Sequence, residues 1–207
     1  DTTVQVWDPA AEEPTIVARL HNQHPVDQIV WSPPGQLLAG FGDEHISIWD
    51  LNATGSPANP ITLKHPGVFA MEWSQDGRRL ISKGEESVRA WEITAEHTTT
   101  ALIDLPTNRW SDRVAWNPDG AWLAVGQPSG AIEVWNLTES SPNASPLRLS
   151  HPGMSNIAWA PNGTRLVSAG ETHLRLWNLS TDVGFANPID LPYPSQIWST
   201  IDILAWS

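Results

Sequence analysis

The chain has 207 residues, of which 23 are acidic and 11 basic, so its net charge is −12. This length can bury a core, either as one large domain or as a run of repeats. The acidic balance argues against nucleic acid as a ligand, because a phosphate backbone requires a basic face, and it favours basic partners. The chain lacks cysteine, which excludes disulfides and thiolate metal sites. No apolar run approaches the roughly 20 residues of a membrane span, and we expect a cytoplasmic protein that binds no membrane.

Ten of the thirteen tryptophans fall on two series that run through the whole chain. One series is Trp7, Trp49, Trp91, Trp135 and Trp177, and the other is Trp31, Trp73, Trp116, Trp159 and Trp206. Successive members of each series lie 42 to 47 residues apart. A period of this size is typical of stacked supersecondary units, so the sequence predicts a repeat protein.

Each period is predicted to contain four short strands. The first is an apolar run that ends in a tryptophan of the second series, as in "QIVW" at 28–31. The turn after it carries a glycine, at Gly35, Gly77, Gly120 or Gly163. Pro, Asp or Asn before glycine favours a tight hairpin. A second apolar run follows, and then a third such as "ISIWD" at 46–50, whose alternation indicates a strand on a half-buried sheet.

A polar loop joins the third run to a fourth, and it is written twice in similar form. The two copies are "IWDLNATGSPANPITLKHPG" at 48–67 and "VWNLTESSPNASPLRLSHPG" at 134–153. We predict four complete four-stranded sheets over about residues 15–51, 61–93, 101–137 and 147–179, with a third-position strand at 1–8 and the start of a further repeat at 188–207. Such short strands cannot cover their own faces, so neighbouring sheets must stack. This predicts an all-β fold, a β-propeller of four-stranded antiparallel blades.

These features resemble the WD-repeat family. The dipeptides Trp7-Asp8 and Trp49-Asp50 match the pair that names the family, and Trp91-Glu92, Trp135-Asn136 and Trp177-Asn178 are common variants of it. The resemblance implies a polar network in which a histidine before the first strand is bonded to an acid in the turn before the third strand and to the tryptophan strand. The residues at these positions are His24, His65 and His151, the acids Asp43, Glu85 and Glu171, and the tryptophans Trp49, Trp91, Trp135 and Trp177. The third repeat has Leu105-Pro106 instead of the histidine and Ser129 instead of the acid.

The resemblance also implies a ring of about seven blades, more than this chain supplies. Its strands number nineteen where a five-bladed ring needs twenty, and the missing one is a second strand. Without it a first and a third strand would lie about 9.6 Å apart, too far to hydrogen-bond. We therefore expect an incomplete portion of a larger ring, completed by further blades from the same parent chain or from another copy.

The sequence contains no catalytic or phosphate-binding motif of a familiar kind. The histidines recur at repeat spacing, so they are expected on different blades and not around one ion. We therefore expect no enzyme activity, no metal and no cofactor. Two alternatives remain open: a propeller enzyme or lectin-like carbohydrate binder with its site at the central channel, and a purely structural assembly scaffold.

The candidate binding residues are those that depart from the repeat pattern. Trp110 and Trp198 belong to neither series and lie in the loops that enter first strands. Each ring either covers its own blade or, with Arg109 and Tyr193, contributes to a partner-binding surface, since Trp and Arg dominate interface energetics. The further candidates for that surface are His45, Lys83, Gln127 and His173. The expected function is a non-catalytic protein-interaction or ligand-sensing module, within a multidomain signalling protein, that binds a protein or peptide.

Overall fold

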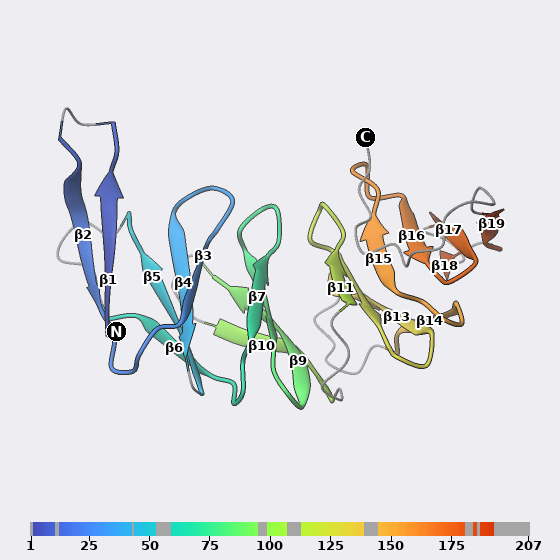
Figure 1. Ribbon diagram of the computed structural model, residues 1–207, viewed down its shortest axis with the longest axis horizontal. Coiled ribbons are helices and arrows are strands. Elements are labelled where there is room, and N and C mark those ends of the chain that lie inside the picture. The colour runs from blue at the N-terminus through green and yellow to red at the C-terminus, as the bar shows by residue number, and fades with distance from the viewer. Residues whose placement is uncertain are drawn as a thin grey trace. The chain divides into compact units, whose positions relative to one another are not determined.

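All regular elements in the described part of the chain are β-strands. The structure is a computed structural model that describes residues 2–10, 13–42, 44–52, 59–94, 99–106, 113–138, 145–180, 184–185 and 187–192. Within these ranges there is no helix (Figure 1), and hence none long and apolar enough to cross a membrane. The predicted all-β fold class is confirmed.

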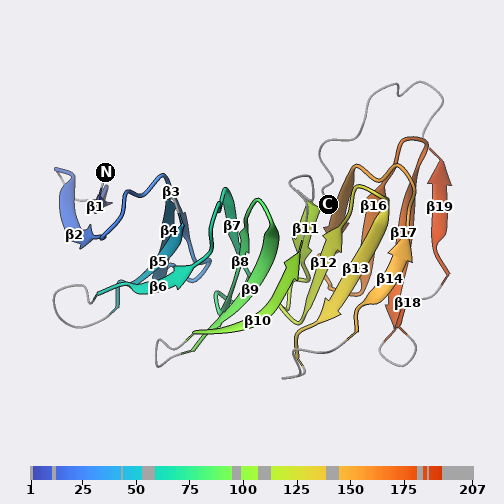
Figure 2. The same cartoon turned by 90° about the horizontal axis from the view of Figure 1, so that it is seen from below.

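The strands pair antiparallel in five sheets, here called A to E. Sheet A contains β1 (Thr3–Asp8) and β2 (Thr15–His21), and sheet B contains β3 (Gln28–Trp31), β4 (Leu37–Gly42), β5 (His45–Asp50) and β6 (Ile61–Lys64). Sheet C contains β7 (Ala70–Trp73), β8 (Arg79–Lys83), β9 (Ser87–Ile93) and β10 (Thr99–Pro106). Sheet D contains β11 (Arg113–Trp116), β12 (Trp122–Gly126), β13 (Ala131–Asn136) and β14 (Leu147–Ser150). Sheet E contains β15 (Asn156–Trp159), β16 (Arg165–Ala169), β17 (His173–Ser180) and, at its edge, β19 (Ile189–Pro192), while the short β18 (Gly184–Phe185) pairs with the end of β17 (Figure 2).

Four sheets with a full set of four strands were predicted and are present, but their boundaries are shifted by one strand. The strand at 15–21 was assigned to the sheet that contains 28–50, whereas it pairs with β1. That sheet is completed by β6, after the polar loop, and the fourth strands of sheets C, D and E follow in the same way. A repeat period has no intrinsic starting point, and only the antiparallel pairing of the fourth strand with the third assigns it to a sheet.

The first strand of the chain pairs with the second, aligning Val4 with Leu20. Among the described residues, β1 has no other strand neighbour. Residues 193–207 lie outside the described ranges, so the first-position strand expected there, and with it the incomplete ring, stays a prediction.

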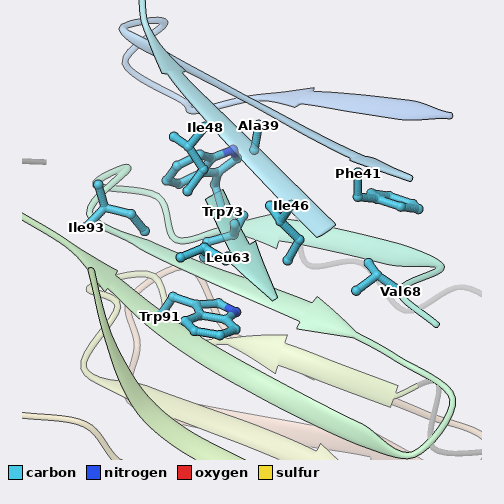
Figure 3. Close-up of a cluster of buried hydrophobic side chains, with 10 residues drawn as sticks. Ala39, Phe41, Ile46, Ile48, Leu63, Val68, Trp73, Trp91 and Ile93 are labelled. Carbon is cyan, nitrogen blue, oxygen red and sulfur yellow. The ribbon is translucent and has the colours of Figure 1, made fainter. Parts of the chain in front are cut away.

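The chain divides into two compact units, residues 1–107 and 108–207, each considered by itself. In the first unit, sheet B is covered on both faces. Trp49 packs with Leu20 of sheet A, while Ile46 and Ile48 belong to a cluster shared with Trp91 of sheet C (Figure 3). In consequence β5 is buried from Ile46 to Trp49 without the expected alternation. In β2, by contrast, more and less exposed residues alternate, and the buried cluster of sheet A in the described part of the chain is shared with sheet B alone.

The second unit repeats this packing between sheets D and E. Ile132 and Val134 of sheet D lie in one buried cluster with Ile157, Trp159 and Trp177 of sheet E. Each of these strands is too short to bury much alone, so the apolar faces are removed from water mainly by the neighbouring sheet. The stacking predicted from strand length is thus present in both units.

First strands of consecutive sheets are joined by a tryptophan indole. The N–H of Trp73 donates to the carbonyl of Val30 at 3.2 Å, and the N–H of Trp159 donates to the carbonyl of Ala115 at 3.1 Å. The two bonds are equivalent, because each acceptor precedes the matching tryptophan of the preceding sheet. Trp73 is 6% exposed, whereas Trp31 in the same position of sheet B is 44% exposed.

Three sheets carry an ion pair between the third strand and the residue opposite it on the fourth. The pairs are Arg89 with Asp104 at 3.0 Å, Glu133 with Arg148 at 3.3 Å and Arg175 with Asp190 at 2.6 Å. Exposed pairs of this kind contribute only about 0–1 kcal/mol each. These pairs favour the observed register of the two strands. A slip by one residue would move each charged side chain to the opposite face of the sheet, away from its partner.

The predicted glycine turns are confirmed. Gly35, Gly77, Gly120 and Gly163 all have positive φ angles, between 69° and 73°. At Gly77 a second constraint acts, because a Cβ there would lie 2.7 Å from Cδ of Pro34 in the preceding sheet. This glycine is required both by the turn conformation and by the close approach of two sheets.

We predict that Trp73→Phe lowers the free energy of unfolding by about 1–3 kcal/mol, because it removes the bond to Val30 and part of a buried ring. The matched control is Trp31→Phe, expected to change stability by less than about 0.5 kcal/mol since this ring is partly exposed. Urea denaturation followed by circular dichroism measures both. Equal losses in the two variants would contradict the assignment of Trp73 as a link between sheets.

Candidate functional site

The polar centre of sheet C is a hydrogen-bonded chain of four side chains that ends on the tryptophan of β9. The indole N–H of Trp91 donates to the hydroxyl of Ser82 at 2.8 Å, and this hydroxyl lies 2.6 Å from Nδ1 of His65. The other ring nitrogen, Nε2, lies 3.0 Å from the hydroxyl of Ser87. An indole can only donate, so the hydroxyl of Ser82 is available to donate to Nδ1. A neutral imidazole with its proton on Nε2 satisfies every one of these bonds.

This network also joins two sheets. His65 directly follows the last strand of sheet B, and its backbone N–H donates to the carbonyl of Glu44 in that sheet at 2.8 Å. Its ring reaches Ser82 on β8 and Ser87 on β9, both in sheet C. His65 is therefore hydrogen-bonded to sheet B through its backbone and to sheet C through its ring. It is buried, with 1% of its surface exposed.

Sheet E contains the same arrangement. Trp177 donates to the hydroxyl of Ser168 at 3.0 Å, and this hydroxyl lies 2.7 Å from Nδ1 of the fully buried His151. The place of Ser87 is taken by His173, whose ring centroid lies 4.6 Å from that of His151. Nε2 of His151 has no hydrogen-bond partner within the described part of the chain.

The acids implied by the resemblance occupy a different place from the expected one. The side chain of Glu85 is exposed, and a Cβ on Gly67, in the His-Pro-Gly turn, would lie 3.0 Å from its Cγ. Glu171 lies in the same way over Gly153. The histidines are bonded to serine hydroxyls where an acid was expected, because the acids project over the turn and the serines lie beneath the rings. Asp43 lies outside the described residues.

Sheets B and D lack this network. Gly40 and Gly126 stand nine residues before the tryptophan, where sheets C and E have serine. The space is filled by neighbours: a Cβ on Gly40 would lie 2.9 Å from Val26, and one on Gly126 would meet Met154. The indole nitrogens of the remaining two tryptophans, the buried Trp49 and the half-buried Trp135, have no hydrogen-bond partner in the described ranges.

The sequence analysis missed the serines. The signal that identifies them is a serine nine residues before the tryptophan, present at Ser82 and Ser168 and absent from the other two repeats. Serines also stand at four other positions in the described strands, so the spacing of Ser82 and Ser168 from the tryptophan becomes informative only once the hydrogen bond is seen.

His24 departs from its equivalents. It is half-buried, and its ring stacks on that of His45 with 4.3 Å between centroids and 2° between planes. The stretch from this histidine to the first-strand tryptophan is one residue shorter than in the other two repeats. Instead of a bond to a histidine ring, the hydroxyl of Ser47 donates to Oδ1 of Asn22 at 2.7 Å. The shortened connection thus gives sheet A and sheet B a different polar link.

The remaining candidate binding residues lie at ends of second and third strands. His45 begins β5 and Lys83 ends β8 in the first unit, while Gln127 follows β12 and His173 begins β17 in the second. All four side chains are half-buried. The other four candidates, Arg109, Trp110, Tyr193 and Trp198, lie outside the described residues.

Burial sets the charge state of the two network histidines. Desolvation lowers the pKa of His65 from 6.5 to about 4, assisted by the nearby Arg89 guanidinium. The pKa of His151 is lowered to about 4 for the same reason, assisted by His173 and Arg175. Both imidazoles are therefore neutral at pH 7 and act as hydrogen-bonding links. Within the described ranges, no group of three or more histidine or acidic side chains is placed to hold a metal ion.

Comparisons with known proteins show that the chain is similar to WD-repeat proteins. The family model of the WD domain, G-beta repeat, matches residues 14–50 and 145–178, close to two of the predicted repeats. An uncharacterized WD repeat-containing protein of Schizosaccharomyces pombe is 29% identical over 157 residues, covering 70% of this chain and 32% of its own. A probable cytosolic iron-sulfur protein assembly protein 1 of Cryptococcus neoformans is 34% identical over 76 residues, covering 34% of this chain and 16% of its own. The chain thus spans a third or less of the length of these curated relatives.

A solved structure supports the same fold. A functionally unknown protein from Desulfotomaculum acetoxidans aligns with 90% of this chain and 63% of its own, at a TM-score of 0.60 and 14% identity. Identity this low concerns the fold alone. Together with the four-stranded sheets and the family match, it confirms the expectation of WD-repeat β-propeller blades.

We predict that Ser82→Ala lowers the free energy of unfolding by about 2–4 kcal/mol, because it leaves both the Trp91 N–H and the His65 Nδ1 buried without a partner. Ser87→Ala serves as the graded control, with an expected loss of about 1 kcal/mol since it removes one half-buried bond. Thermal and urea unfolding measure both. A smaller loss for Ser82→Ala than for Ser87→Ala would show that the network does not hold the sheets.

We also predict that stability falls with acidity between pH 6.5 and 4. In this range the unfolded chain protonates His65 and His151, whereas the folded chain keeps both neutral because each folded pKa is about 4. Their stabilising effect is complete above pH 6.5 and is lost as the pH falls to 4, by about 3 kcal/mol for each histidine. Urea denaturation between pH 7 and 4.5 tests this, and His151→Asn should reduce the slope by about half. A stability independent of pH in this window would contradict the prediction.

Proposed function

We propose that this WD-repeat chain is a protein-interaction scaffold without catalytic chemistry of its own. The observation that carries the proposal is the WD-repeat match itself, on a chain whose sheets stack as repeats. The use of His65 and His151 as buried, neutral links supports it further, because these candidate reactive groups already bond the sheets together. A rigid stack of sheets can hold several loops in fixed positions, which suits recognition of a partner.

The proposed binding surface lies where second strands turn into third strands. We infer that Arg109, Trp110, Tyr193 and Trp198 contribute to it from the loops before first strands. His45, Lys83, Gln127 and His173 would flank those loops, and their half-burial at strand ends supports a fixed, partly accessible position. Aromatic and arginine side chains on a rigid support are typical of residues that dominate binding energy.

The cellular setting belongs to the same proposal. We infer a cytoplasmic module of a larger multidomain protein that passes a binding event to an attached signalling domain. The location is supported by similarity to a relative named as a cytosolic assembly protein. A larger parent protein is supported by the much greater length of the relatives.

We predict that the triple substitution Arg109→Ala, Trp110→Ala and Trp198→Ala removes most partner protein recovered by affinity purification of the intact parent protein. The control is Trp7→Ala, which changes an exposed tryptophan far along the chain from these loops. Quantitative mass spectrometry measures recovery, and unchanged melting temperature shows that the variant is folded. Recovery of the same partners by the triple variant would favour a purely structural scaffold.

A further inference from the structure

A cleft of about 660 Å³ lies between sheets B and C of the first unit, at the strand ends opposite to His45 and Lys83. Its walls come from the turns after the first strands and from the C-terminal ends of β5 and β9. This volume is in the range of pockets that bind a small ligand. The cleft shares no residue with the histidine networks or with the proposed partner-binding loops.

The charged residues that line the cleft are mostly acidic. Asp50 and Glu92, the residues after the tryptophan in two consecutive repeats, contribute a carboxylate from each sheet, and Asp76 adds a third. Arg78 is the basic side chain among the lining residues, and Arg79, behind Glu92, lies 3.8 Å from its carboxylate. Among the lining residues, three carboxylates therefore accompany one guanidinium group, that of the exposed Arg78, and this excess of negative charge favours a cation.

The same cleft has an apolar part. Pro34, Leu37 and Ile93 line it together with the carboxylates. A long basic side chain matches this combination, because its methylene stem can pack on apolar surface while its charged end reaches the acids. Arginine fits better than lysine, since its planar guanidinium has five N–H donors and can bridge carboxylates that come from two different elements.

The corresponding seam in the second unit is built differently. There Asn136 and Asn178 stand at the positions of Asp50 and Glu92. The side chain of Asn117 crosses the seam and donates to the carbonyl of Gly163 at 2.8 Å. The repeat does not require acidic residues at these positions, because the equivalent place between sheets D and E has neutral asparagines.

We propose that the cleft between sheets B and C is a binding site for an arginine side chain of an extended basic peptide. The guanidinium binds the carboxylates of Asp50 and Glu92, and the aliphatic part of the side chain packs on Leu37. The net charge of −12 attracts the basic peptide to the chain, and the cleft selects one side chain of it.

The test uses a fluorescein-labelled nine-residue peptide of alternating alanine and arginine, with fluorescence anisotropy at about 0.15 M salt, where long-range attraction is largely screened. The double variant D50N/E92Q keeps the shape of both side chains, including the Oδ1 that accepts the backbone N–H of Asn52. It should weaken binding about tenfold or more, because it removes two charge-assisted contacts. The matched control E44Q/E86Q removes the same charge from exposed residues at the opposite ends of the same two strands and should change binding less than about twofold.

Two further arms keep the test decisive. The peptide with citrulline in place of arginine has the same size without charge and should not bind, and the lysine peptide should bind several-fold more weakly. Ser32→Asn changes no charge but should donate to Gly77 as Asn117 does to Gly163, narrowing the cleft and weakening the arginine peptide even if D50N/E92Q does not fold.

Three results would overturn the proposal. The first is absence of binding by the arginine peptide, or equal binding of the citrulline peptide. The second is an equal loss in E44Q/E86Q, which would assign binding to net charge alone. The third is lysine binding as tight as arginine. Each outcome is independent of the loop residues in the proposed function, so either proposal can fail without the other.

Discussion

The hydrogen bonds of a buried histidine hold consecutive sheets in place. Sheets in this protein meet mainly through apolar side chains, which supply most of the favourable free energy but little direction, and through a small number of hydrogen bonds such as that from Trp73 to Val30. His65 adds direction, because its backbone is bonded to the turn of one sheet and its ring to hydroxyls of the next. This one residue thereby holds the segment that connects sheet B to sheet C in a defined position. A neutral ring satisfies all of these bonds, and burial keeps the ring neutral by lowering the pKa of His65 to about 4.

The repeats differ in whether they contain this polar link. Sheets C and E use serine between histidine and tryptophan, whereas sheets B and D fill that space with a methyl or thioether group from a neighbouring segment. Trp49 is nonetheless only 1% exposed. Apolar burial is thus the property common to the repeats, and the polar bridge is an addition to it. The first unit ends at Thr107, one residue beyond the Leu105-Pro106 pair that replaces the histidine.

The third strands carry different chemistry at their two ends. In β5 and β9, the beginning of the strand lies near histidine and serine, and the end of the strand carries Asp50 or Glu92. The middle of each strand is buried and packed. A strand of six or seven residues therefore separates two surfaces that can vary without disturbing the core. This separation is the physical reason that the two proposed binding surfaces lie at opposite ends of the same strands.

Much of the fold could be predicted from the sequence, because period and turn chemistry are local. The spacing of the tryptophans, the glycine turns such as Gly77 and the alternation around Trp91 define strands and repeats without knowledge of any contact. The family resemblance also located His65 and His151, since both follow the fourth strand at a constant distance from the first-strand tryptophan.

Only the tertiary structure decided which strands form a sheet and what the histidines bind. The strand at 15–21 reads the same whether it ends one sheet or begins another, and its pairing with β1 is a long-range choice. Ser82 has no local feature that distinguishes it from other strand serines. Glu85 stands at the position in the turn where the family pattern has its acid, so the sequence does not reveal that His65 bonds serines instead. The hydroxyl lies beneath the ring and the carboxylate projects over Gly67 because of how two sheets pack. The cleft between Asp50 and Glu92, 42 residues apart in sequence, exists for the same reason: it forms where two separately specified sheets meet, and no local pattern describes that meeting.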